Sequence, residues 1–237
     1  VVVTGSHGAP GITSITANLA WKVSSGREVI AIDKDPIRQD LHYLFNARGQ
    51  DVSRVSARLR ISTSIPEAEP EKLLIIDAGP APQLRNAQSD RRRVGREFME
   101  LVERAGAIIY VTQPEKCHNN ELSSFFSELQ ELGFSGWSSL IVNKYLPCKE
   151  HRMLFQEIES SVRSSNLRAI PRDVPSFDRS KAASLLVTQV SARSKVRKAV
   201  DALATDLIQA ISHESVRSTG VTSETSKREH NSQRARK

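Results

Sequence analysis

The stretch VVVTGSHGAPGITSITANLAWKVS, residues 1–24, joins a short apolar run to a glycine-rich turn and then to a segment of helical periodicity. The apolar run at 1–3 predicts a buried strand, and Ile15, Leu19 and Val23 recur at the spacing of one helix face. The glycines between them mark a tight loop, so the chain begins with strand, loop and helix in direct succession.

The loop has the composition of an anion-binding turn. Such a turn points successive backbone N–H groups toward an anion and places it at a helix N-terminus, where free donors and the helix dipole favour negative charge. The candidate cofactor-binding residues here are Gly8, Ala9, Gly11, Ile12, Thr13 and Ser14. A glycine-rich turn that simply connects a strand to a helix in another α/β domain is an equally good interpretation of the loop alone.

The loop matches the phosphate-binding motif G-x-x-x-x-G-K-[ST] only in part. Thr13 stands where that motif places the hydroxyl that ligates magnesium. Ile12 occupies the position of the motif's lysine, and Ser6 occupies that of its first glycine. The flanking strand and helix, rather than the motif itself, therefore support a phosphate loop.

Acidic side chains follow two further apolar strands. The segment 27–36 runs into Asp33 and Asp35, and the segment 73–82 runs into Asp77. In a doubly wound sheet the carboxyl ends of the strands border the ligand crevice, where carboxylates can hold magnesium and orient a water molecule. We therefore take these three acids as candidate catalytic residues, with Asp33 and Asp77 joining Thr13 as candidate metal ligands. The alternative for Asp35 is a helix cap that precedes a proline.

The rest of the chain alternates between strand and helix patterns. We expect strands at 107–114, 138–147 and 167–174, a loop at 61–72, and helices at 36–58, 89–104, a segment ending at Gly133, 150–163, 178–188 and 194–212. This alternation predicts an α/β fold with a doubly wound, mostly parallel sheet and helices on both faces. Asn143 ends the strand at 138–147, where its amide could read an adenine edge or could simply form a turn.

Length and composition favour one domain with a tail. A chain of 237 residues can bury one sizeable core, and we assign 1–212 to that domain and 213–237 to a disordered basic tail, because the tail is almost free of apolar residues. The formal net charge of +7 favours anionic partners. No apolar run is long enough to span a membrane, and the two cysteines form no metal motif, so we expect a cytoplasmic protein. The sequence starts at Val1, inside a strand and without an initiating Met, so we expect either a shortened chain or a missing upstream domain.

Five segments in this order, GSHGAPGITS, AIDKDP, LIIDAGP, LIVNKY and IPRD, resemble the ParA/MinD family of deviant Walker ATPases. The similarity covers residues 1 to about 211. The GAPG loop at 8–11 is similar to the loop of the CpaE/TadZ branch of this family, which is tied to pilus assembly and protein positioning.

The resemblance implies ATP or ADP with Mg²⁺ as cofactors, binding to the loop at 6–14. It assigns magnesium ligation to Thr13, the second-strand acid to Asp33, a switch-like segment to Asp35, and the Walker B carboxylate to Asp77. It also places base reading on Asn143 and on the loop that starts at Pro171.

The sequence departs from this family at two basic positions. His7 stands in place of the signature lysine that reaches across a dimer interface, and Ile12 replaces the lysine that holds the β- and γ-phosphates. Removing one charge-assisted hydrogen bond weakens nucleotide binding by roughly tenfold to a hundredfold. We therefore expect weakened or lost nucleotide binding and slow hydrolysis.

Several functions remain open at this point. The first is a nucleotide switch with weak or absent ATP hydrolysis, which forms a nucleotide-dependent homodimer and localises a pilus, secretion or division machine through a protein partner. The second is a pseudo-ATPase scaffold that binds no nucleotide. The third is a partition-type ATPase that binds DNA through basic helix faces.

Overall fold

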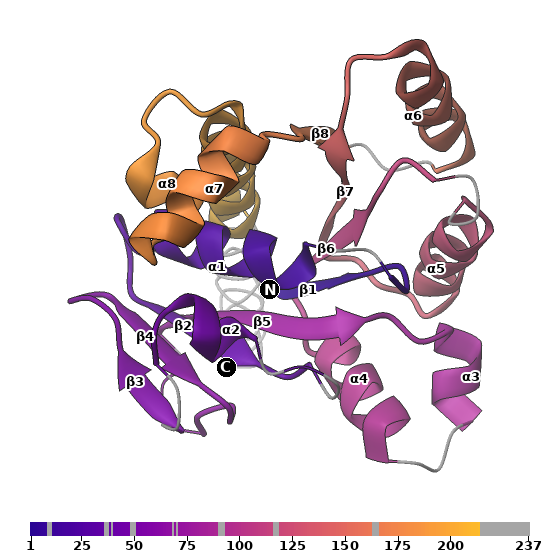
Figure 1. Cartoon of the computed structure of the whole chain (residues 1–237). Coiled ribbons are helices and arrows are strands. Elements are labelled where there is room, and N and C mark those ends of the chain that lie inside the picture. Colours follow the sequence, from indigo (N-terminus) through magenta and orange to yellow (C-terminus); the bar gives the residue numbers. More distant parts are fainter. Residues whose placement is uncertain are drawn as a thin grey trace, which may run out of the picture.

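The structure is a computed structural model that describes residues 1–8, 11–35, 38, 40–47, 51–67, 69, 71–89, 93–115, 119–162 and 166–213. A single sheet of eight strands runs through this part of the chain, with helices packed on both of its faces (Figure 1). Within the same residues no helix is both long enough and apolar enough to cross a membrane.

The sheet is parallel except at one edge. Its order is β3-β4-β2-β5-β1-β6-β7-β8, and only β3 pairs antiparallel with its neighbour. The strands are β1 (Val2–Gly5), β2 (Val29–Asp33), β3 (Val52–Arg54), β4 (Leu59–Ser62), β5 (Leu73–Pro80), β6 (Ala107–Thr112), β7 (Trp137–Tyr145) and β8 (Leu167–Pro171). The central strands are buried on both faces, which explains their continuous apolar sequence. The predicted doubly wound sheet is confirmed.

The helices divide between the two faces of the sheet. They are α1 (Ile12–Val23), α2 (Leu41–Leu44), α3 (Leu84–Ser89), α4 (Arg93–Glu103), α5 (Asn119–Glu131), α6 (Lys149–Ser161), α7 (Val174–Ala183), α8 (Val187–Val190) and a last helix at 195–213. The helix α1 and the last helix pack in one apolar cluster, whereas α4, α5 and α6 contribute to a second cluster on the opposite face. This arrangement leaves the carboxyl ends of the parallel strands to border a common site.

Three predicted segments were wrong in detail. The helix expected at 36–58 is reduced to α2, and the short strand β3 takes part of its place. The strand β4 enters the start of the segment expected as a loop at 61–72. The helix expected at 178–188 is two helices, α7 and α8, separated by Ser184 in a left-handed conformation.

The first two errors share a physical cause. The strands β3 and β4 are short, and β3 is an edge strand with largely exposed side chains, so its sequence lacks the apolar run of a central strand. The predicted tail lies almost entirely outside the described residues, the last of which is residue 213.

Candidate functional site

The glycine-rich loop begins at the carboxyl end of β1, in the middle of the sheet. Gly8 and Gly11 both have positive φ angles, of 68° and 129°. The Gly11 carbonyl accepts the first hydrogen bond of α1 from the Ile15 amide at 2.8 Å. Ala9, a predicted cofactor-binding residue, lies outside the described residues, as does Pro10. Strand, loop and helix therefore follow one another as the sequence predicted.

Asn143 packs directly against the backbone of Gly11. A Cβ atom at Gly11 would collide with the Asn143 side-chain amide nitrogen. Asn143 is buried near the end of β7, and the next residue, Lys144, has a positive φ of 56°. The fold thus brings together two residues that the sequence analysis assigned to the same nucleotide from distant segments, and it explains why position 11 requires glycine.

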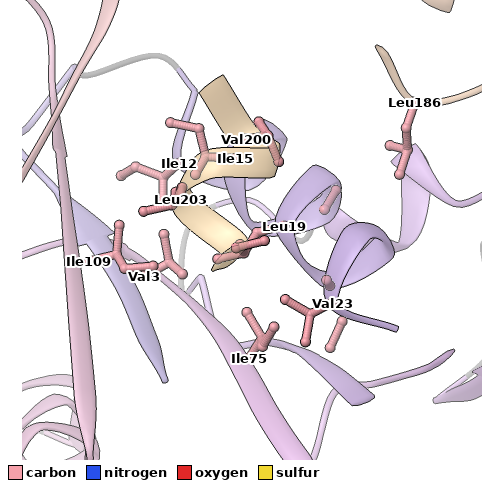
Figure 2. Close-up of a cluster of buried hydrophobic side chains, with 14 of the residues drawn as sticks. Val3, Ile12, Ile15, Leu19, Val23, Ile75, Ile109, Leu186, Val200 and Leu203 are labelled. Atoms are coloured by element: carbon pink, nitrogen blue, oxygen red, sulfur yellow. The ribbon is translucent and has the colours of Figure 1, made fainter. Parts of the chain in front are cut away.

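Ile12 turns its side chain into the protein core instead of toward the loop. It is 6% exposed and belongs to the apolar cluster that contains Val3, Ile15, Ile109 and Leu203. Figure 2 shows these side chains gathered between the sheet, α1 and the last helix. The position that the motif gives to a lysine is therefore part of the packing between β1 and α1.

Thr13 and Asp77 meet where α1 faces the end of β5. Asp77 is fully buried, and its Oδ1 accepts a hydrogen bond from the Gly79 amide at 3.1 Å. Burial raises the pKa of Asp77 to about 7, while the Thr13 hydroxyl and the Gly79 amide favour the ionised form. Asp77 Oδ2 has no hydrogen-bond partner among the described residues.

Asp33 lies beside Asp77, because the two residues are register partners on β2 and β5. Side chains alternate between the faces of a strand, and Ala31 and Ile75, two positions earlier, belong to the cluster beneath α1. Both carboxylates therefore project toward the α1 face. Asp33 Oδ2 accepts a hydrogen bond from the Leu41 amide at 2.9 Å, whereas Oδ1 has no partner within the described part of the chain.

Burial also raises the pKa of Asp33, although the Leu41 and Asp35 amides and the nearby His42 favour its ionised form. The charges of Asp33 and Asp35 in turn add to the increase at Asp77. The site is therefore a cluster of acids in which ionisation is electrostatically unfavourable, and a bound cation would relieve that cost.

Asp35 completes the acidic group from the loop after β2. Its carboxylate packs on Gly79, where a Cβ atom would lie 2.9 Å from the carboxyl carbon of Asp35. Asp35 Oδ1 accepts a hydrogen bond from the Arg38 amide at 3.1 Å. This hydrogen bond resembles the cap that the sequence analysis offered as an alternative, and the same carboxylate also reaches the segment that follows Asp77.

The donors fit a magnesium ion that also binds phosphate oxygens. Magnesium in such sites is held through one or two carboxylates, waters and the substrate phosphates, not by a full protein cage. The Thr13 hydroxyl and the unpartnered oxygens of Asp33 and Asp77 would hold it. The described residues contain no cluster of three or more His, Cys, Asp or Glu side chains arranged as a metal cage.

The remaining predicted residues, Ser14, Pro171 and Ser6, make contacts other than with the acids. The Ser14 carbonyl accepts a hydrogen bond from Asn18 Nδ2 at 2.7 Å, within α1. Pro171 ends β8 and pairs in register with Tyr145, so it lies at the same sheet edge as the end of β7. Ser6 contacts the Thr112 hydroxyl at 3.1 Å, which ties the start of the loop to β6.

One residue at this site was not predicted from the sequence. His42 on α2 is buried, and its Nδ1 lies 3.6 Å from Asp33 Oδ2. It is a lone histidine in a segment predicted as a long helix, so no spacing or motif indicated that it would approach the acids.

The chain matches no protein-family model and no curated protein sequence. Solved structures, in contrast, resemble it over most of its length. A ParA family ATPase from Chlorobium tepidum TLS has a TM-score of 0.61 and 19% identity, over 86% of this chain and 97% of that one.

Two further structures contain nucleotides. The septum site-determining protein MinD from Pyrococcus horikoshii OT3, complexed with Mg-ADP, has a TM-score of 0.67 and 17% identity, over 87% of this chain and 93% of that one. The ATP complex of a Cyanothece McdA variant has a TM-score of 0.69 and 13% identity, over 87% and 95% of the two chains. This chain therefore has the fold of the ParA and MinD ATPases.

Proposed function

We propose that this protein is a MinD/ParA-like nucleotide-binding positioning protein with weak or absent ATP hydrolysis. Its role is to localise a pilus, secretion or division machine in the cytoplasm, through a protein partner and a nucleotide-dependent homodimer. The resemblance of its loop to the CpaE/TadZ branch supports the pilus and positioning role, and the names of the structural neighbours, which include septum-site and partition proteins, support the broader class.

The observation that carries the proposal is that the acidic side chains suited to magnesium are present, whereas the loop has an apolar residue where the motif has a lysine. Thr13 lies beside Asp77, and Asp33 is the register partner of Asp77. Each of the two carboxylates has one oxygen without a partner among the described residues, which supports magnesium binding by these three residues. Ile12, at the lysine position, is packed into the core and offers the phosphates no charge. Magnesium would neutralise phosphate charge when bound. The lysine side chain that would stabilise the transferring phosphate is replaced at this position by the uncharged Ile12.

Direct titration tests the proposal. We expect isothermal calorimetry to show ADP and ATP binding that is weaker than in relatives with the lysine and that strengthens when magnesium is present. Single-turnover assays should show little or no hydrolysis of bound ATP. Hydrolysis at rates ordinary for the family would contradict our interpretation of Ile12.

Two other functions are separated by the same measurements. A pseudo-ATPase scaffold would bind neither nucleotide in either condition, and the uncharged, core-packed Ile12 at the lysine position favours this function. A DNA-binding partition ATPase is favoured by the basic residues of the last helix, and its binding would fall steeply with salt. No DNA binding at low salt in a gel-shift titration would exclude this third function.

A further inference from the structure

His42 has a buried side chain whose polar atoms are unsatisfied in the described part of the chain. Neither ring nitrogen has a hydrogen-bond partner among these residues, and the side chain is only 9% exposed. Buried polar groups are almost always hydrogen-bonded, and each exception calls for a physical explanation. A carboxylate oxygen, Asp33 Oδ2, lies 3.6 Å from Nδ1 of this ring.

The two contacts of Asp33 from α2 fall on the same oxygen. The Leu41 amide donates to Oδ2 at 2.9 Å, and His42 Nδ1 approaches that atom as well. Oδ1, the other oxygen, has no partner in the described part of the chain. The protein thus fixes one oxygen of the carboxylate and leaves the second unpaired within these residues.

We propose that His42 is a positioning residue for Asp33: together with the Leu41 amide it holds Oδ2 on the α2 side, so that Oδ1 faces the ligand. This inference rests on the proposed function, because the ligand in question is the magnesium nucleotide. The groups that orient a metal-binding side chain commonly matter almost as much as the ligand itself, and their loss costs about tenfold to a hundredfold in metal affinity.

The end of α2 also contacts the turn between α7 and α8. Asn46, just after α2, donates a hydrogen bond to the Ser184 carbonyl at the end of α7, at 3.2 Å. His42 and Asn46 therefore connect the Asp33 carboxylate to the turn between α7 and α8.

Three variants test the role of His42. His42→Leu removes the nitrogen donor, His42→Asn keeps an amide nitrogen near the position of Nδ1, and Leu44→Ala on the same helix removes apolar packing while leaving the Asp33 contacts in place. Binding of a fluorescent ADP analogue is measured with magnesium and with EDTA, and the ratio of the two affinities reports magnesium coupling. Amide hydrogen exchange at Leu41 is measured in the nucleotide-free protein.

We expect the magnesium coupling to fall about tenfold in His42→Leu and to be restored within about threefold by His42→Asn. Exchange at Leu41 should accelerate in His42→Leu alone, and Leu44→Ala should lower the melting temperature without changing the coupling. Unchanged coupling and unchanged Leu41 exchange in His42→Leu would overturn the inference. Failure of the wild type to bind the analogue would refute the proposed function instead, and the exchange measurement would still decide the role of His42.

Discussion

Asp33 and Asp77 are register partners on the neighbouring parallel strands β2 and β5, and both carboxylates project toward α1. Each carboxylate retains one buried oxygen with no partner among the described residues. Two adjacent buried acids are costly to ionise, because burial and mutual repulsion both disfavour the charged forms. The same arrangement makes the pair suitable for a cation and makes the ligand-free protein sensitive to pH.

Asp77→Asn should stabilise the ligand-free protein at neutral pH. The pKa of Asp77 is raised to about 7 in the folded state, so the folded protein keeps a proton that the unfolded chain loses near its ordinary value of 3.8. Below about pH 4 both the folded and the unfolded states keep the proton, so Asp77 does not lower the free energy of unfolding. As the pH rises to about 7 the unfolded chain loses its proton first, and the free energy of unfolding of the wild type falls. Asparagine cannot ionise, so the variant is spared this loss. The advantage of the variant should therefore grow across that window to at most roughly 4 kcal/mol.

Thermal melts in EDTA from pH 4 to 8 measure this effect. Each kcal/mol corresponds to about 2–4 °C for a domain of this size. Asp178→Asn, a substitution of an exposed acid on α7, is the matched control and should leave the pH profile unchanged. A constant difference between Asp77→Asn and wild type across the pH range would contradict the raised pKa.

Gly11→Ala should destabilise the protein and abolish nucleotide binding. The φ angle of 129° is unfavourable for alanine, and the added methyl group would collide with the Asn143 amide. Backbone strain of this kind costs about 1–3 kcal/mol. Chemical denaturation measures the loss. Gly26→Ala is the control, because the nearest atom to its new methyl group would be 4.0 Å away.

The double variant Gly11→Ala with Asn143→Ala separates the two causes. It removes the collision and keeps the strained φ, so it should recover only part of the lost stability. Full stability in the single variant would show that the loop does not hold residue 11 at a positive φ against Asn143.

Ile12→Lys should tighten nucleotide binding while lowering stability. A lysine at this position restores the missing phosphate contact and should improve ADP affinity by about tenfold. The same substitution removes a buried side chain from the cluster around Val3 and Ile109, at a cost of about 2–4 kcal/mol. Calorimetry and thermal melts measure the two effects independently.

Ile15→Lys provides the comparison for this substitution. Ile15 is equally buried one turn further along α1, so its replacement should lower stability without any gain in affinity. A similar gain in both variants would mean that added positive charge, not the position of Ile12, controls binding.

Truncation before Ser215 should leave the melting temperature nearly unchanged. The residues removed have almost no apolar side chains, so their loss should expose no core. Truncation before Ala199, in contrast, removes Val200, Leu203 and Leu207, each at most 1% exposed, and should cost several kcal/mol. A large drop in melting temperature after the first truncation would show that the tail packs on the domain.

The sequence alone was sufficient for the central strands and for their acidic tips. A parallel strand buried on both faces needs a continuous apolar run, and such runs predict β1, β2, β5, β6 and β7. Because the carboxyl ends of parallel strands share one edge, the strand pattern by itself places Asp33 and Asp77 near Thr13, as the fold confirms. The edge strand β3 could not be found this way, because it buries too little to impose an apolar pattern.

Only the tertiary structure decided which side chains actually face one another at the site. Gly11 and Asn143 are distant in sequence, and their contact depends on how β7 ends beside the loop. The inward turn of Ile12 is set by the packing of α1 against the sheet and the last helix. The approach of His42 to Asp33 is set by the position of α2 beside β2. Local sequence patterns specify which residues a strand or helix buries, but side-chain contacts between distant segments exist only once those segments are packed together.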